Sequence, residues 1–421
     1  MKKLTLSVIG LYCLLLSAFS QSNAADTTNY KSKKLKLDEV NLVSGYYNQN
    51  GDHSAVTGGI GTQKLNDVAN IIDLQLVKWN DANNKYTWSA ELGIDHHTAA
   101  SQKYVSLTGA SRADGTRIYP SLNWQVETSK GYTFGLGASL SSEYNYNSAS
   151  ANFVIGKLSK NKNTEISFKG QAFFDKVTLI EPSELIPKTT VTTGTTTVYT
   201  TASGNVISSG GGGDEHHKAN IPSSPRNTFA GSLTLSHVVN KSLQFAVIAD
   251  GVAQNGYLSL PFYRVYFKNE DSARIEHLPG TRYKLPLGIR LNYFLGDKII
   301  LRTYYRYYTD SWGVTAHTAS LEVPYKVSSF FSISPFYRFY TQTASHYFAP
   351  YGEHLTADTY YTSNYDYSAF RSQYFGVNFK ITPKNGVFNI PAFNTLEIRY
   401  GRYMQTTGLG ANNIGLNLKF K

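Results

Sequence analysis

Hydrophobic and polar residues alternate along most of this chain in runs of about ten residues. In one run, Trp88, Ala90, Leu92 and Ile94 alternate with polar or small residues. The same alternation recurs at 118–127, 132–140, 284–293, 299–308 and 395–401. Because successive side chains of a β-strand point to opposite faces, each run predicts a strand with one apolar and one polar face. Strands of this length can cross a bilayer at a tilt.

The connections between these runs alternate between short turns and longer segments. Short polar turns are predicted at 80–85, 128–131, 160–164, 240–241, 296–298, 324–328 and 383–389. Longer segments are predicted at 48–66, 97–116, 179–227, 253–283 and 343–370, with shorter connections near 143–150 and 310–314. This alternation predicts an all-β fold over residues 39–421, a transmembrane antiparallel meander barrel of about 16 strands. Its turns would be periplasmic and its long loops extracellular.

Three segments fit the pattern poorly. Pro335 lies inside the run 330–341, where a missing backbone donor predicts a bulge. The segment Tyr257–Phe267 is apolar, but its apolar and polar residues do not alternate regularly. It could be a loop folded inward or the extension of a strand. The segment 189–214 is rich in Thr, Ser and Gly, so we expect a flexible part of the long external loop 179–227. Some of it could form a strand pair.

The N-terminus has the features of a secretory signal peptide covering residues 1–24. Lys2 and Lys3 precede an apolar stretch, and Ser22-Asn23-Ala24 offers a small-x-small cleavage site. The single cysteine, Cys13, lies inside this segment. The mature chain would therefore have no disulfide, thiolate metal site or cysteine nucleophile. Residues 25–38 are polar and Lys-rich, and we expect a loose periplasmic arm there.

Composition agrees with strands that face lipid on alternate residues. Mean hydropathy is −0.31, and no segment after the signal peptide approaches the roughly 20 apolar residues of a membrane helix. Aromatic residues nevertheless make up 14%, including 32 Tyr and 22 Phe, as expected for the aromatic girdles of a barrel. The formal charge of +11 becomes +9 when Lys2 and Lys3 are removed. We expect no nucleic-acid partner, because an exported protein rarely meets one.

The chain ends in an alternating strand, Ile414–Phe420, in which Ile414, Leu416, Leu418 and Phe420 share one face. This segment resembles the last strand of bacterial outer-membrane barrels. The resemblance implies an integral protein of the Gram-negative outer membrane, in contact with its lipid. It also implies that the barrel-assembly machinery binds this strand.

Further motifs extend the resemblance from about Ser44 to the C-terminus. They are Ser54–Thr62, Ala110–Arg117, Pro286–Arg290, Tyr304–Gly313, Pro335–Ala344, Tyr347–Tyr351 and Tyr365–Phe370. Through them the chain resembles the bacterial domain-of-unknown-function family 3570. The family resemblance implies an outer-membrane protein, but it brings no established reaction, ligand or catalytic residue.

If the apolar phase faces lipid, the polar phase lines the lumen. We predict an acidic wall from the early strands, consisting of Glu91, Asp95, Glu127, Glu165 and Asp175. We predict a basic wall from the late strands, consisting of Arg290, Arg302, Arg306, Arg338, Lys380 and Arg399. Opposite walls of opposite sign would set a transverse field across a pore. The alternative is that these charges pair across neighbouring strands and fill the interior.

Tyr304 lies between Arg302 and Arg306 on one face, and Arg338 with Tyr340 could adjoin them from two strands away. Guanidinium groups bind carboxylates or phosphates, and tyrosine rings stack on flat ligands. A solute site and a structural Arg–Glu ladder both remain possible uses.

Neither metal nor catalytic chemistry is predicted. In the pair His96-His97 adjacent side chains would face opposite ways, and the pair His216-His217 lies in a Gly-rich loop without a rigid support. No Gly-x-Ser-x-Gly or comparable motif is present. We therefore expect no metal site, no catalytic residue, no cofactor and no enzymatic activity.

The sequence is best explained by a porin-like channel for small solutes with a charge-segregated lumen. About 16 strands would enclose an aqueous channel, whereas about eight would be filled by side chains. The alternative is a non-conducting scaffold for surface binding or assembly, with its barrel plugged by the segments 179–227 and 253–283. Monomer and trimer both remain open, as does the identity of the solute.

Overall fold

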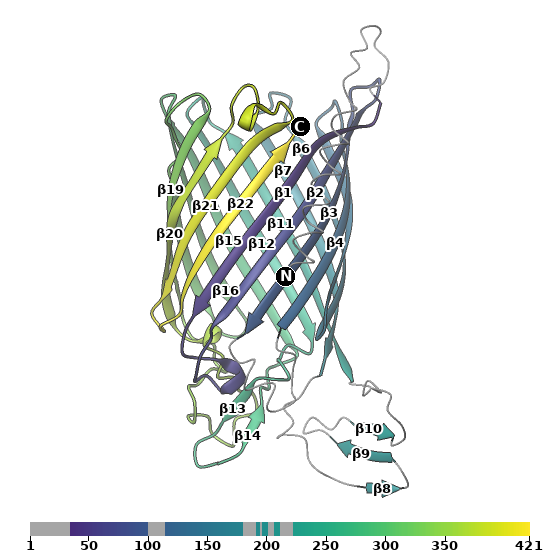
Figure 1. Cartoon of the computed structure of the whole chain (residues 1–421), viewed down its shortest axis with the longest axis vertical. Helices are drawn as coiled ribbons and strands as arrows, with labels where there is room; N and C mark the ends of the chain where they lie inside the picture. The colour runs from purple at the N-terminus through teal and green to yellow at the C-terminus, as the bar shows by residue number, and fades with distance from the viewer. Residues whose placement is uncertain (1–33, 100–113, 180–190, 194–195, 201–205, 211–221) are drawn as a thin grey trace.

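The computed structural model describes residues 34–99, 114–179, 191–193, 196–200, 206–210 and 222–421. The predicted signal peptide, most of the predicted arm and much of the loop 179–227 lie outside these residues. One closed sheet dominates the described chain (Figure 1). Its strands are β1 (Lys36–Asn50), β2 (Leu65–Trp79), β3 (Lys85–Ala99), β4 (Asp114–Glu127), β5 (Tyr132–Glu143), β6 (Tyr146–Leu158), β7 (Thr164–Thr178), β11 (Ser223–Val238), β12 (Leu243–Gly256), β15 (Thr281–Leu295), β16 (Ile299–Asp310), β17 (Thr315–Glu322) with β18 (Tyr325–Lys326), β19 (Phe331–Gln342), β20 (Phe370–Ile381), β21 (Phe393–Gln405) and β22 (Gly410–Phe420).

The sheet is an antiparallel meander that closes on itself. Each strand pairs with the next one along the chain, and β22 pairs with β1 from Val40↔Phe420 to Asn50↔Gly410. Since β17 and β18 are two segments of one strand, the barrel has 16 strands, as predicted. Closure leaves no sheet edge whose backbone groups would be unpaired in lipid.

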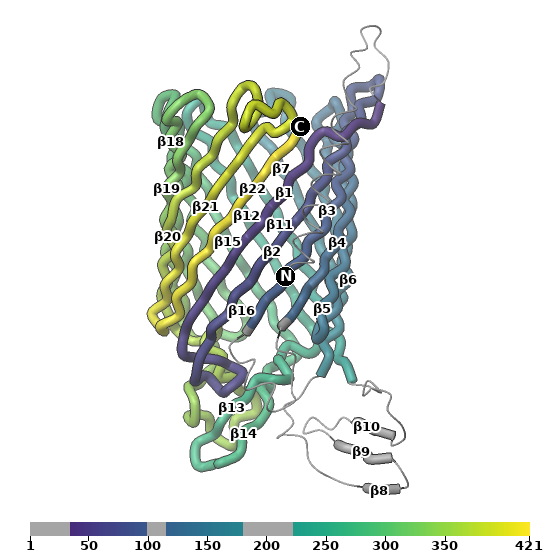
Figure 2. Tube along the Cα trace, in the orientation of Figure 1, coloured from purple at the N-terminus to yellow at the C-terminus, as the bar shows by residue number. Residues whose placement is uncertain are grey.

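Short turns gather at the end of the barrel where the C-terminus lies, and long loops extend from the other end (Figure 2). The turns span 80–84, 128–131, 159–163, 239–242, 296–298, 327–330 and 382–392. The long connections include 51–64, 257–280 and 343–369. These are the periplasmic and extracellular ends of an outer-membrane barrel, respectively.

The apolar phase of the strands covers the outside of the barrel. Leu92, Leu136 and Ile289 are 40%, 49% and 40% exposed, as expected for side chains that meet lipid. The polar phase hydrogen-bonds inside, as where the Ser139 and Ser150 hydroxyls lie 2.7 Å apart. The alternation along the sequence therefore separates the side chains that face lipid from those that face the lumen.

The extracellular loops pack into a folded cluster of their own. Leu258, Leu278 and Trp312 form a small apolar core, with Tyr347 and Tyr367 packed against it. The loop 257–280 contains the hairpin of β13 (Arg264–Tyr266) and β14 (Ala273–Ile275), which lies beyond the strand ends (Figure 1). The segment Tyr257–Phe267 thus belongs to this external cluster and does not extend a barrel strand.

The remaining elements are small. The loops contain the 3-10 turns η1 (Ala55–Thr57), η3 (Tyr365–Tyr367) and η4 (Val387–Asn389). Part of the loop 179–227 forms a separate sheet of β8 (Val191–Thr193), β9 (Thr196–Thr200) and β10 (Val206–Gly210). Among the helices that the structure describes, none is long and apolar enough to cross a bilayer.

Two details differ from the sequence prediction. β1 begins at Lys36 rather than Glu39, so the end of the predicted arm belongs to the barrel. No bulge occurs at Pro335, because β19 pairs with β20 in unbroken register through Pro335↔Val377. The partner strand is interrupted instead, between β17 and β18 at 323–324, with the register preserved on both sides. The missing donor of Pro335 falls opposite this gap, where Val323 still donates to the Pro335 carbonyl at 2.9 Å but receives no bond from the proline in return.

Candidate functional site

The predicted charged residues lie on two different halves of the barrel. The acidic residues lie on β3, β4 and β7, and the basic residues lie on β15, β16, β19, β20 and β21. Neither half has a single sign, because Arg117 and Lys169 lie among the acids and Glu322 and Glu397 among the bases.

One ion pair identifies the inner face of the basic half. Arg399 Nη1 of β21 lies 3.9 Å from Glu322 Oε2 of β17, although β19 and β20 lie between these strands. Side chains from such distant strands converge only on the concave side of a sheet. In the acidic half, Asn152 Nδ2 of β6 similarly reaches Asn123 Oδ1 of β4 at 3.4 Å, across β5. The polar phase therefore points into the lumen.

Half of the predicted basic wall is neutralised by nearby carboxylates. Glu322 accepts a bond from Arg302 at 3.1 Å and also contacts Arg399. Lys380 Nζ lies 2.7 Å from Glu397 Oε1, on the next strand. These contacts form a short Arg–Glu and Lys–Glu ladder.

The other half, Arg290, Arg306 and Arg338, has no carboxylate within 4 Å among the described residues. Each guanidinium lies near a tyrosine ring instead, at centroid distances of 5.8 Å for Arg290 and Tyr304, 5.9 Å for Arg306 and Tyr308, and 5.0 Å for Arg338 and Tyr374. These contacts orient the guanidinium groups without cancelling their charge.

Some residues of the predicted acidic wall also have partners. Asp175 lies 3.5 Å from Arg226 Nε of β11, and Asp95 accepts a bond of 2.7 Å from the Tyr119 hydroxyl. Glu127, near the periplasmic end of β4, accepts a bond of 3.2 Å from Gln125. No ion pair joins Glu91 or Glu165 to a cation within the described segments.

The basic half contains a cavity of about 660 Å³ that we call the arginine–tyrosine cavity. The strand register places Ser320 between Tyr304 and Arg338, so a short side chain separates two long ones. Thr318 and Ser372 are equally short, and together these residues leave room for a small molecule. The lining residues are Tyr304, Arg306, Tyr308, Thr318, Ser320, Arg338, Tyr340, Asp366, Phe370, Ser372 and Tyr403.

Asp366 was not predicted from the sequence. It lies in η3 of the extracellular loop 343–369, where the Asn364 side chain accepts a bond from its backbone amide. It lines the arginine–tyrosine cavity and an adjoining cavity of about 570 Å³, and Arg338 lines both as well. No strand period extends into this loop, so only folding brings Asp366 to the cavity that Arg306 and Arg338 line.

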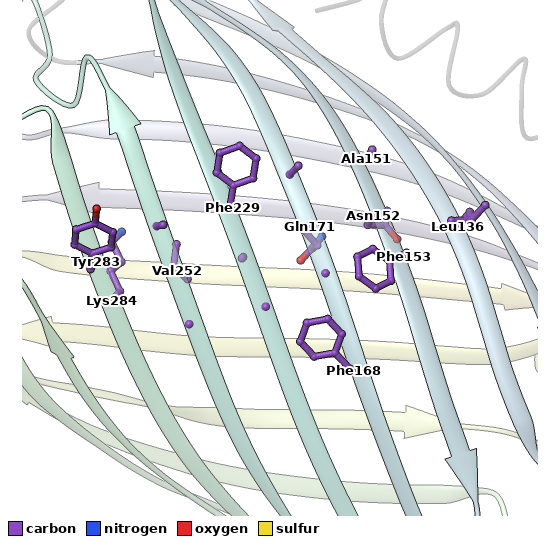
Figure 3. Close-up of a pocket in the computed structure, with 16 residues that line it drawn as sticks. Leu136, Ala151, Asn152, Phe153, Phe168, Gln171, Phe229, Val252, Tyr283 and Lys284 are labelled. Carbon is purple, nitrogen blue, oxygen red and sulfur yellow. The ribbon is translucent and has the colours of Figure 1, made fainter.

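A larger hollow, of about 810 Å³, lies against the outer surface of β6, β7, β11 and β12 (Figure 3). Phe153, Phe229 and Leu136 border it, and all three belong to the exposed apolar phase. Three glycines, Gly170, Gly231 and Gly251, occupy paired positions on three adjacent strands. Because they have no side chains, they leave this part of the outer surface hollow. The acyl chains of membrane lipid can fill such a surface, so this hollow is not the candidate site.

The histidines provide no metal centre in the described part of the chain. His97 points inward to Glu143, at 3.5 Å, and His96 points outward to the Thr116 hydroxyl, at 3.0 Å. No group of three His, Cys, Asp or Glu residues is close enough to hold an ion among the residues that are described. His216 and His217 lie outside them.

Comparison with solved structures finds several outer-membrane barrels at low similarity. A BenF-like porin from Pseudomonas fluorescens Pf-5 matches with 8% identity and a TM-score of 0.40, covering 91% of this chain and 98% of that one. OccK7 of Pseudomonas aeruginosa matches with 9% identity and a TM-score of 0.42, covering 92% and 98%. CdiB from Acinetobacter baumannii matches with 8% identity and a TM-score of 0.44, covering 94% and 70%. At these scores the matches carry no information on the solute.

No curated protein matches the chain in sequence. One family model does match, over residues 13–414, which is nearly the whole chain. That extent confirms the resemblance seen in the motifs. The chain belongs to the family described as "Protein of unknown function (DUF3570)".

Proposed function

We propose that this protein is a porin-like conduit for small solutes in the outer membrane of a Gram-negative bacterium. Export would use the N-terminal signal peptide, and assembly would begin at β22. Sixteen strands are enough to enclose an aqueous lumen, and polar side chains such as Asn123, Asn152 and Glu322 point to the inside of the barrel. A lumen lined in this way suits the passage of hydrated solutes rather than catalysis.

The observation that carries the proposal is a set of lumen arginines that have no carboxylate within 4 Å in the described part of the chain. Arg290, Arg306 and Arg338 keep their charge on one side of the barrel. Glu91 and Glu165 lie on the other half. A structural ladder would have neutralised these groups, whereas a conduit uses them to attract and orient solutes.

The direct test is conductance of the purified, folded barrel in a planar bilayer. We expect stepwise openings with a preference for anions, because Arg290, Arg306 and Arg338 have no carboxylate within 4 Å among the described residues. Folded barrel that inserts into the bilayer but carries no current would contradict the proposal.

One observation favours the second candidate, a surface-binding or assembly scaffold. The extracellular cluster has an apolar core and fully buried polar side chains, including Arg264, which donates to the Val56 carbonyl. Such a rigid surface could bind a partner outside the cell. The scaffold would insert without conducting, so the same bilayer experiment separates the two functions.

A further inference from the structure

The arginine–tyrosine cavity contains charges of both signs that do not neutralise each other. Arg306 and Arg338 line it from β16 and β19, and Asp366 lines it from the extracellular loop 343–369. No ion pair joins Asp366 to either arginine in the described structure, so more than 4 Å separates the carboxylate from both guanidinium groups. The carboxylate and the two guanidinium groups therefore line the cavity at separate positions.

The same space is lined by aromatic rings. Tyr304, Tyr340 and Phe370 contribute to the wall, and the ring of Tyr340 lies 5.6 Å from that of Phe370. Tyr340 donates to Gln342 at 2.7 Å, which fixes its ring against the wall. A volume of about 660 Å³ is within the range of small-molecule sites.

These features select for particular ligand chemistry. A carboxylate fits the fork of a guanidinium, and an ammonium group fits the Asp366 carboxylate. A solute that has only one of these groups leaves either the arginines or Asp366 without a partner. In a confined space, a charged group without a partner costs binding free energy. A flat ring gains contact with the tyrosine faces.

We propose that the arginine–tyrosine cavity binds zwitterionic aromatic solutes, that is, small molecules with a carboxylate, an ammonium group and a ring. Their carboxylate lies against Arg306 and Arg338, and their ammonium group lies against Asp366. The proposal rests on the proposed conduit function and specifies its substrate class.

Three probes with the same ring test the assignment at neutral pH. Phenylalanine has both charges, 3-phenylpropanoate has only the carboxylate, and 2-phenylethylammonium has only the ammonium group. Binding to the detergent-solubilised, folded barrel is measured by calorimetry, and current in a planar bilayer is measured in parallel. We expect phenylalanine to bind at least about tenfold more tightly than either singly charged analogue, as two charged contacts allow.

Two variants assign the charges within the cavity. Asp366→Asn should abolish the preference for phenylalanine over 3-phenylpropanoate, and Arg306→Gln with Arg338→Gln should abolish the preference over 2-phenylethylammonium. Asp366→Asn is nearly isosteric and lies in a loop, so it tests the site without disturbing the barrel. Matched controls are Asp81→Asn in the periplasmic turn 80–84 and Arg117→Gln on β4, which should preserve both preferences.

The outcomes separate this inference from the conduit function. Equal binding of the three probes, or equal effects of cavity and control variants, would overturn the inference even if the barrel conducts normally. Selective phenylalanine binding without any current would support the site and overturn the conduit.

Discussion

At the scale of single residues, Gly376 shows how a missing side chain shapes the lumen. Gly376 pairs with Phe336 and Gly401 on the neighbouring strands. A Cβ atom at this position would lie 2.8 Å from the Phe336 ring and closer still to the Tyr400 carbonyl. The Phe336 ring in turn lies under the Arg399 guanidinium, at 4.0 Å. The glycine thus keeps room for the aromatic ring that supports Arg399.

We expect Gly376→Ala to destabilise the folded barrel by roughly 1–3 kcal/mol, because the added methyl must displace backbone or the Phe336 ring. Denaturant titration of the detergent-solubilised protein measures the loss. Gly251→Ala is the matched control, since a Cβ there has no atom within 4 Å. Equal loss in the two variants would show that the close approach at Gly376 is unimportant.

Glu276 gives the extracellular cluster a pH dependence. Burial raises the pKa of this carboxyl from its ordinary value of 4.5 to about 7. Bonds from the Thr362 hydroxyl and from the Leu260 amide, the latter at 2.8 Å, offset the burial in part. The proton therefore binds more tightly in the folded cluster than in the open one.

Because the folded pKa is the raised one, the stabilisation is complete below about 4.5 and is lost as pH rises through about 7. The cluster should open more readily at pH 8 than at pH 5, by up to about 3 kcal/mol. Hydrogen exchange of residues 257–280 measures this opening. Glu276→Gln should flatten the profile, and an unchanged profile in that variant would assign the effect to another group.

At the scale of elements, the phase of each strand decides which substitutions are tolerated. Leu136 faces lipid, so Leu136→Arg near the midplane should cost roughly 2–4 kcal/mol. Ser139→Arg on the same strand should cost less, because Ser139 faces the lumen beside Ser150. Folding yield in lipid vesicles compares the two. A higher cost at Ser139 would mean that the inside and outside of the barrel have been exchanged.

The strands could be predicted from the sequence because period-two alternation is local. The runs containing Leu92, Leu136 and Ile289 specify their own faces, and the turns between them specify the order of the strands. The interruption at 323–324 could not be predicted from Pro335 alone. It depends on which residues of the neighbouring strand lie opposite the proline, and that register is a property of the folded sheet.

For the charged walls, the sequence predicted only that their residues lie on the polar faces of the strands. Alternation placed Arg302 and Arg338 on the polar face. It could not distinguish Arg302, which pairs with Glu322, from Arg338, which pairs with no carboxylate of the segments that the structure describes. Asp366 had no predictive signal, since it enters the cavity from a loop without periodicity. The contacts that decide the chemistry join residues far apart in sequence, and these require the closed barrel.

At the scale of the whole molecule, the barrel depends on the pairing of its first and last strands. β22 pairs with β1 along its full length, and Phe420 stacks on Phe393 with ring centroids 4.9 Å apart. Deleting residues 414–421 should prevent assembly, because two unpaired edges would remain in lipid.

Loss of the heat-modifiable, folded band in outer-membrane fractions measures this failure. Removal of Lys421 alone is the control, since it leaves the β22–β1 ladder complete. Normal insertion of the longer truncation would be incompatible with a barrel closed by β22.

The conduit with a charged lumen is tested most directly by its reversal potential across a salt gradient in a planar bilayer. Screening shortens the reach of Arg290, Arg306 and Arg338 from roughly 30 Å at 0.01 M salt to about 3 Å at 1 M. We predict anion preference at low salt that fades at high salt, and a shift toward cations when Arg306→Gln and Arg338→Gln are combined. A folded, inserted barrel without current, or with the same selectivity at both salt concentrations, would contradict the account.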